Sequence, residues 1–163
     1  TTVNENPDVQ ALVDITVLIE RSVKQFISTP RVAVLSYSNF GSNEGTIPEK
    51  TREAVRLLHE KYPDMIVDGE MQANFAINVN LSKDNYPFST LRGKPANTLI
   101  FPNLESGNIA NKLLQELGGA EAVGPVLLGM NKPVHILQLG SSVREVVNMI
   151  TIAVVDAQAK ELV

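Results

Sequence analysis

The sequence lacks cysteine and tryptophan altogether, and aromatic residues make up only 5% of its 163 residues. Without cysteine the chain cannot form a disulfide, bind a metal through thiolates or use a cysteine nucleophile. Zinc ribbons, thiol redox motifs and cysteine hydrolases are therefore excluded. The hydrophobic fraction of 44% and the charged fraction of 20% are typical of a globular protein with one core, or with two lobes that share an interface.

Basic clusters and long hydrophobic runs are missing as well. The formal net charge is −4 and no three lysines or arginines are consecutive, so nucleic acids and anionic membranes are poor candidate partners. Apolar runs are short, as at 152–155, and the N-terminal segment is polar; we expect no membrane span, no signal peptide and a cytoplasmic location. The first residue is threonine instead of methionine, so we expect the chain to belong to a longer protein.

Apolar periodicity, caps and chain breakers predict alternating helices and strands, and hence an α/β fold with a mostly parallel sheet flanked by helices. Helices are expected at about 6–26 with Asn6 as its cap, 48–61, 72–79, 109–117 and from Ser142 onward, with a polar loop over 82–95. Strands are expected at 31–36, 65–69, 96–101, 122–128 and 134–137.

The last helix has the clearest start signal. Ser142 and Glu145 have the spacing of a capping box, in which each side chain bonds the backbone amide of the other residue. Its apolar residues are expected to share one face, which could pack within the lobe or across an interface between subunits. They are Val143, Val146, Val147, Ile150, Val154 and Ala157.

Two polar loops follow predicted strands, at 36–46 and 103–108. In parallel sheets ligands bind beyond the carboxyl ends of the strands, and loops rich in hydroxyls and free amides suit an oxyanion such as phosphate. Neither loop matches a P-loop or a dinucleotide fingerprint. Two solvated loops with ordinary helix caps therefore remain the alternative interpretation.

The histidines and the acidic residues carry little functional signal. We expect His59 to be a solvated helix residue and His135 to be a hydrogen-bonded, partly buried strand residue, with neither acting in catalysis. Asp64, Asp68 and Glu70 form a small acidic cluster between a turn and a strand end. We expect no metal site there.

Several segments together resemble the phosphate acetyl/butyryl transferase family, and the combination is more specific than any one of them. The resemblance extends from about Asn4 to Gln158. The segments are Arg-Val-Ala-Val-Leu-Ser-Tyr-Ser from 31, Asp-Gly-Glu-Met-Gln from 68, Leu-Ile-Phe-Pro-Asn-Leu-Glu-Ser-Gly-Asn from 99, Gly-Pro-Val-Leu-Leu-Gly-Met-Asn-Lys-Pro-Val from 124, and the valine-rich last helix.

The resemblance implies a fold of two α/β lobes around a cleft, with the isocitrate/isopropylmalate dehydrogenase-like architecture. Family enzymes transfer an acetyl group between coenzyme A and phosphate. Residues 1–163 correspond to the C-terminal part of this bilobal unit, namely one lobe and the final helix of the other. Coenzyme-A-binding arginines from the family's first segment therefore have no counterpart that can be assigned in this sequence.

The sequence departs from the family after Lys132-Pro133-Val134. Active members continue Asn-Asp-Leu-Ser-Arg-Gly, where serine and arginine serve the transition state and an aspartate one turn later acts as base. Here Gln138 and Leu139 replace the serine and the arginine, and Glu145 stands at the aspartate position. No residue is therefore assigned a catalytic role.

A phosphotransacetylase-like domain without this constellation resembles the one fused behind the catalytic part of large bacterial NADP-dependent malic enzymes, where it senses acetyl-CoA. The first hypothesis is that the chain is such a regulatory domain, with acetyl-CoA as its effector. We expect no cofactor in this fragment. NADP and a divalent metal are expected in the malic enzyme part. The residues expected to bind the ligand are Ser36, Ser38, Asn39, Gly41, Ser42, Ser106, Gly107 and Asn108.

Two alternatives remain open. The chain could be part of an active transferase that moves an acyl group between coenzyme A and phosphate. It could also be a structural module whose family surfaces serve oligomerisation. Because the family forms dimers, the resemblance implies a homodimer or a larger homo-oligomer in each case.

Overall fold

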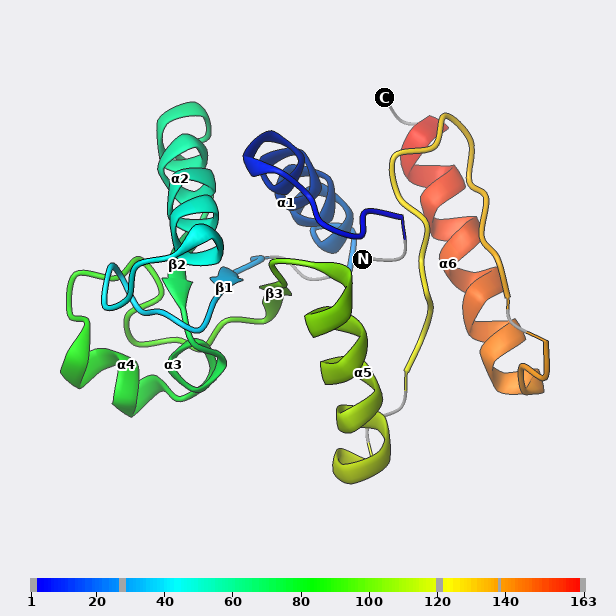
Figure 1. Cartoon of the computed structure of the whole chain (residues 1–163). Helices are drawn as coiled ribbons and strands as arrows, with labels where there is room; N and C mark the ends of the chain where they lie inside the picture. The colour runs from blue at the N-terminus through cyan, green and yellow to red at the C-terminus, as the bar shows by residue number, and fades with distance from the viewer. Residues whose placement is uncertain (1–2, 27–28, 120–121, 138, 162–163) are drawn as a thin grey trace. The chain divides into compact units, whose positions relative to one another are not determined.

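The computed structural model describes residues 3–26, 29–119, 122–137 and 139–161 (Figure 1). The chain divides into two compact units, Thr1–Ile109 and Ala110–Val163, which are considered separately below. In the described residues no helix is both long enough and apolar enough to cross a membrane.

The first unit contains a parallel sheet of three strands, β1 (Val32–Leu35), β2 (Val67–Met71) and β3 (Thr98–Ile100), in the order β2-β1-β3. All four residues of the central strand β1 are buried, as expected for a strand that is covered on both faces. The predicted α/β class with a parallel sheet is therefore confirmed.

Alternate residues of β1 belong to two separate cores. Val32 and Val34 pack in one core with α1 (Val9–Val23) and α2 (Thr46–Lys61). Ala33 and Leu35 pack in the other, with α3 (Ala73–Ile77) and the segment that follows α4 (Val79–Asn85). Figure 1 shows α1 and α2 on one side of the sheet and α3 and α4 on the other.

Gly69 lets β2 approach β1 closely. It stands opposite Val34 in the register with a φ of +143°, and a Cβ at this position would lie 2.5 Å from the Val34 carbonyl oxygen. Only glycine fits this combination of backbone conformation and close contact. The residues that follow Gly69 on β2 are thereby held against the loop after β1.

Several predicted boundaries in this unit were wrong. The cap of α1 is Asp8, whose Oδ1 accepts a 2.8 Å hydrogen bond from the Ala11 amide, while Asn6 precedes the helix. The strand predicted at 65–69 begins at Val67 and continues to Met71, and part of the predicted loop 82–95 belongs to α4. The end of β2 was predicted too early because Glu70, a polar residue, is buried there by hydrogen bonds to Ser38, Gly41 and Arg52.

The helix α5 (Leu104–Gly118) starts five residues earlier than the sequence predicts and continues into the second unit. The strands predicted at 122–128 and 134–137 are absent from the described residues, where 122–137 forms neither helix nor strand. Pro125 and Pro133 lack an amide hydrogen, which opposes pairing in the interior of a sheet.

The last helix, α6 (Val143–Glu161), has the predicted capping box. The Ser142 amide donates to Glu145 Oε2 at 2.6 Å, and the Glu145 amide donates to Ser142 Oγ at 3.2 Å. The apolar residues predicted to share one face lie at helical spacing within α6, as expected. Met149, which was not among them, is the buried hydrophobic residue of α6 among the described side chains. Four members of the predicted face are exposed, namely Val143, Val147, Ile150 and Val154.

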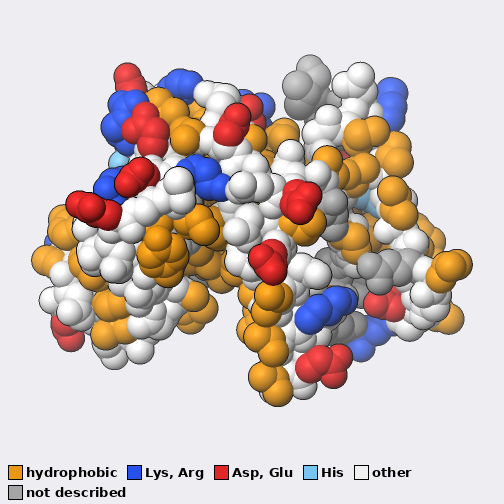
Figure 2. Space-filling view, viewed as in Figure 1, with side chains coloured by type: hydrophobic (Ala, Val, Ile, Leu, Met, Phe, Trp, Pro, Cys, Tyr) orange, Lys and Arg blue, Asp and Glu red, His pale blue; other side chains and the backbone are white. Residues whose placement is uncertain are grey.

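Apolar side chains are also exposed along α5, as Figure 2 shows. They recur at helical spacing. They are Ile109, Leu113, Leu114 and Leu117.

Candidate functional site

The loop after β1 is built around one buried carboxylate, that of Glu70 on β2. Glu70 is fully buried. Its Oε1 accepts hydrogen bonds from Ser38 Oγ at 2.8 Å and from the Gly41 amide at 2.9 Å. The Phe40 amide donates to the Glu70 carbonyl oxygen at 2.8 Å. Glu70 therefore fixes the loop through its side chain and its backbone together.

Arg52 on α2 completes this arrangement. Its Nε donates to Glu70 Oε2 at 3.0 Å and its Nη2 to Oε1 at 2.9 Å, a two-pronged pairing in which the Arg52 side chain remains 43% exposed. Burial alone would raise the pKa of Glu70, but the hydrogen bonds from Arg52, Gly41 and Ser38 hold that pKa below its ordinary value. Glu70 is therefore ionised in the folded protein at neutral pH.

The polar groups of this loop mostly bond one another. Ser42 Oγ accepts from the Asn39 amide at 2.9 Å, and Ser38 Oγ accepts from the Asn43 amide at 3.1 Å. Asn39 Oδ1 accepts from the Gln72 amide at 2.8 Å, and Ser36 Oγ accepts a weaker bond from the Ser38 amide. Ser38, Asn39, Gly41 and Ser42 thus have a structural role in shaping the loop.

The second predicted loop is largely helical. Asn103 Oδ1 accepts from the Ser106 amide at 2.9 Å, so Asn103 is positioned as the cap of α5. Ser106, Gly107 and Asn108, which were expected to precede the helix, lie inside its first turns. The prediction of a capped helix at this place was right, but its start was placed too late.

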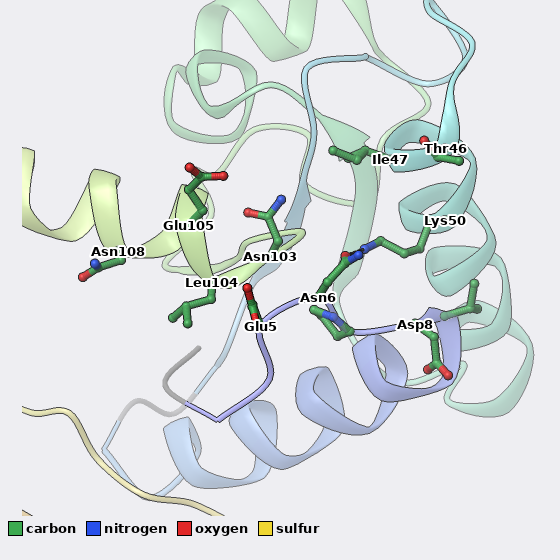
Figure 3. Close-up of a pocket in the computed structure, with 12 residues that line it drawn as sticks. Glu5, Asn6, Asp8, Thr46, Ile47, Lys50, Asn103, Leu104, Glu105 and Asn108 are labelled. Atoms are coloured by element: carbon green, nitrogen blue, oxygen red, sulfur yellow. Dashed lines mark hydrogen bonds between the residues drawn. The ribbon is translucent and has the colours of Figure 1, made fainter.

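The first turns of α1, α2 and α5 surround a cleft of about 1040 Å³ in the first unit (Figure 3). The loop after β1 leads into α2, so the two predicted regions meet at this cleft through the starts of α2 and α5. Asn108 is the one predicted ligand-binding residue in its lining. The lining consists of Glu5, Asn6, Pro7, Asp8, Val9, Thr46, Ile47, Lys50, Asn103, Leu104, Glu105 and Asn108.

Lys50 is the basic residue of this lining, and the sequence analysis missed it. Its Nζ donates to Asn6 Oδ1 at 2.9 Å and to the Pro102 carbonyl oxygen at 3.1 Å, and Figure 3 shows the side chain extending from α2 toward Asn6. Burial lowers the pKa of Lys50, while the nearby Asp8 carboxylate opposes this shift.

The cleft combines amide, hydroxyl, apolar and charged side chains. Three carboxylates, from Glu5, Asp8 and Glu105, outnumber the single lysine of the lining, which gives it a formal charge of −2. Such a lining can exchange hydrogen bonds with an uncharged, amide-containing ligand and contact its apolar parts. It is a poor environment for a multiply charged phosphate group.

Of the three positions where the resemblance places the family's catalytic residues, Leu139 and Glu145 belong to the second unit. Gln138 is outside the described residues. Leu139 is fully exposed, and Glu145 is engaged in the capping box of α6. The hydrogen bond from the Ser142 amide is the main cause that lowers the pKa of Glu145.

The acidic cluster separates into different environments. Asp64 is exposed, whereas Asp68 Oδ2 is buried and accepts from Ser89 Oγ and the Thr90 amide, each at 2.7 Å. Glu70 bonds the loop after β1. Within the described residues, no group of three or more histidine or acidic side chains could hold a metal ion.

The histidines also differ from each other. His59 is exposed as expected, but its Nε2 lies 2.8 Å from the Val67 carbonyl oxygen and so ties α2 to β2. His135 is partly buried as expected, but the prediction that it is hydrogen bonded was wrong. Both of its ring nitrogens are buried and neither has a partner in the described structure.

Known structures define the class of this fold. The EutD phosphotransacetylase from Staphylococcus aureus matches it with a TM-score of 0.85 and 40% sequence identity, over 94% of this chain and 48% of that chain. The chain therefore has a phosphotransacetylase-like α/β fold, as the family resemblance implies.

Sequence comparison then shows the family. The profile described as "Phosphate acetyl/butaryl transferase" matches residues 1–154, and the chain belongs to the phosphate acetyl/butyryl transferase family. It is 43% identical over 164 residues to the NADP-dependent malic enzyme of Escherichia coli, covering 99% of this chain and 21% of that protein. It is 41% identical over 155 residues to the phosphate acetyltransferase of Acetivibrio thermocellus, covering 94% of this chain and 46% of that protein.

The chain thus spans about a fifth of the malic enzyme and about half of the phosphate acetyltransferase.

Proposed function

We propose that this chain is a catalytically silent, acetyl-CoA-responsive regulatory domain of an NADP-dependent malic enzyme. The observation that carries the proposal is the pair Gln138 and Leu139, at the positions where the family resemblance places serine and arginine. Acyl transfer to phosphate develops charge on oxygen atoms, which a guanidinium holds through two hydrogen bonds. Leucine has no donor, and losing an electrostatic group of this kind typically lowers the rate by about 10²–10³.

The environment of Glu145 supports the same interpretation. Its carboxylate accepts the Ser142 amide at the start of α6, and this hydrogen bond lowers its pKa. A carboxylate with a lowered pKa is a weaker base, and helix capping accounts for its position. Glu145 therefore needs no role in proton transfer.

The malic enzyme relative supports the identity of the parent protein. The two sequences are 43% identical over 99% of this chain, but the aligned region is only 21% of the malic enzyme. In our proposal, the rest of the parent protein binds NADP and a divalent metal and oxidatively decarboxylates malate to pyruvate. Regulation then requires that acetyl-CoA bind two states of the parent with different affinity.

The composition of the cleft supports a thioester of coenzyme A as the ligand. The acyl-pantetheine arm of such a thioester is uncharged and carries amide groups, which match the side chains of Asn6, Asn103 and Asn108. The acidic residues Glu5 and Glu105 disfavour the phosphates of the same molecule. We therefore place the arm in the cleft and the phosphates outside it.

The test is a titration of acetyl-CoA into the full-length parent protein, with malate-dependent NADPH formation as the signal and coenzyme A without its acetyl group as the ligand control. We expect the rate to change saturably. Asn108→Asp adds a negative charge to the cleft and should shift the response to higher acetyl-CoA. Asn85→Asp makes the same change on the exposed surface of α4 and should leave the response unchanged. A rate that stays constant at saturating acetyl-CoA would reject the regulatory role.

An active phosphate acyltransferase is the second candidate, favoured by the 41% identity to a phosphate acetyltransferase. It requires that the full-length protein form acetyl phosphate from acetyl-CoA and phosphate. We expect no turnover in a folded sample. Acetyl phosphate that accumulates in proportion to enzyme would establish the transferase instead.

A further inference from the structure

Lys50 differs in its surroundings from the other lysines whose side chains the structure describes. It is half-buried on α2 and lines the cleft. The remaining lysines whose side chains the structure describes are all exposed. They are Lys24, Lys61, Lys83, Lys94, Lys112 and Lys132.

A neutral amine at Lys50 could keep both of the hydrogen bonds that this side chain donates. Its Nζ donates to two uncharged oxygens, Asn6 Oδ1 at 2.9 Å and the Pro102 carbonyl at 3.1 Å. An ammonium group carries three N–H donors, whereas a neutral amine carries two and has a lone pair. Lys50 can therefore lose one proton and keep both hydrogen bonds, which leaves the lone pair available to an electrophile.

Burial and nearby negative charge act on the pKa of Lys50 in opposite directions. Asp8 at the start of α1 favours the ammonium form, and Glu5 and Glu105 line the same cleft. Burial is nevertheless the largest effect, so the pKa of Lys50 is lowered relative to that of an exposed lysine. A larger fraction of Lys50 is consequently neutral and nucleophilic at any given pH.

We propose that Lys50 is a site of covalent acylation by activated acyl donors, namely acyl thioesters, whose uncharged arm suits the cleft, or acyl phosphates, whose charge the acidic lining opposes. The Lys50 nitrogen forms a bond to the acyl carbon as the bond from that carbon to phosphate oxygen or to sulfur breaks. The leaving phosphate or thiolate takes the electron pair, and the proton lost by nitrogen passes to it or to water. The inference rests on the proposed function for the class of acyl donor that the cleft meets.

Acylation would change the charge of the cleft. The product amide is neutral, so the formal charge of the lining falls from −2 to −3, counting Lys50 against Glu5, Asp8 and Glu105. A more negative cleft repels anionic donors more strongly. The acylated cleft would therefore be less favourable for a further anionic acyl donor.

The experiment measures acetylation rates of individual lysines in the full-length protein by mass spectrometry, with acetyl phosphate in one arm and acetyl-CoA in the other. Lys83 and Lys94 are the internal references, because both are exposed in the same unit. We expect Lys50 to react several-fold faster than both references in at least one arm. The arm in which it does identifies the donor.

A conservative variant tests the cause of this reactivity. Asn6→Asp places a carboxylate against Nζ at the position of the amide oxygen and should favour the ammonium form. We expect it to slow acetylation of Lys50 several-fold and to leave Lys83 and Lys94 unchanged. A Lys50 rate no greater than the reference rates in both arms, or a rate unaffected by Asn6→Asp, would overturn the proposal.

The outcome is separable from that of the regulatory hypothesis. Fast acetylation of Lys50 by acetyl phosphate in a protein whose NADPH formation ignores acetyl-CoA would support the modification site and reject the regulation. Slow acetylation of Lys50 in a protein that responds to acetyl-CoA would reject the modification site alone.

Discussion

Replacing Glu70 by glutamine removes the negative charge at the centre of the loop after β1 with little change of shape. The fully buried carboxylate accepts hydrogen bonds from Ser38, Gly41 and Arg52. In Glu70→Gln the remaining side-chain oxygen can still accept the three hydrogen bonds that Oε1 accepts, from Ser38, Gly41 and Arg52 Nη2. The new NH₂ group takes the place of Oε2 and faces the N–H of Arg52 Nε, so two donors meet and no hydrogen bond forms. The guanidinium then lacks its counter-ion and one acceptor.

The size of the effect follows from the burial of the two partners. Removing one member of a buried ion pair typically costs about 3–5 kcal/mol. Arg52 is 43% exposed and can recover hydration, which brings our expectation down to about 2–3 kcal/mol. For a chain of this size, that corresponds to a fall in melting temperature of roughly 4–12 °C.

The assay is urea-induced unfolding followed by far-ultraviolet circular dichroism, with Glu53→Gln as the matched control. Glu53 pairs with Arg56 on the exposed side of α2, where ion pairs contribute little. We expect Glu70→Gln to shift the midpoint to lower urea and Glu53→Gln to leave it nearly unchanged. Equal midpoints for the two variants would refute the structural role assigned to Glu70.

The pH dependence gives a second check on Glu70. Its pKa is lowered in the folded protein, so its stabilisation is complete above the pKa of an unfolded glutamate. That stabilisation is lost as the pH falls through the lowered folded value. The difference in unfolding free energy between wild type and Glu70→Gln should therefore shrink in acid, and a difference that stays constant would contradict the assignment.

Three further substitutions test local features of the fold. Gly69→Ala should destabilise the protein by about 1–3 kcal/mol in the same urea assay, because its Cβ would meet the Val34 carbonyl oxygen at positive φ; an unchanged midpoint would contradict the close approach. Asp8→Ala removes the cap of α1 and should cost about 1 kcal/mol, with Asp8→Asn restoring most of it. Ser142→Ala should speed amide hydrogen exchange in the first turn of α6, and equal exchange in both proteins would exclude the capping box.

Local signals explain why much of the fold could be predicted. The apolar run of β1 and the polar loop after it mark a buried parallel strand, and the spacing of Ser142 and Glu145 marks the start of α6. Each of these signals depends on residues within a few positions of one another. The family resemblance added the overall architecture, which the structural comparison confirms.

The rest depends on contacts between distant segments. A glutamate such as Glu70 is typical of a loop or a surface, yet it is buried in β2. Its burial is possible because Arg52 balances its charge and Ser38 donates a hydrogen bond to it. Lys50 meets Asn6 and Pro102, so the cleft is assembled from three segments that no local pattern connects.

The apolar stretch at 122–128 predicted a strand, but hydrophobicity alone does not supply a neighbouring strand to pair with. The site around Lys50 was therefore not predictable from sequence patterns, and Pro125 and Pro133 were the signals against strands within 122–137.

The most direct test of the proposed function is a calorimetric titration of acetyl-CoA into the full-length protein in phosphate buffer, with acetyl phosphate quantified in the same cell afterwards. We expect saturable binding without acetyl phosphate formation, since Leu139 offers no donor at the position of the family's arginine. Acetyl phosphate formed in proportion to enzyme, or no binding heat at all, would contradict a silent acetyl-CoA sensor.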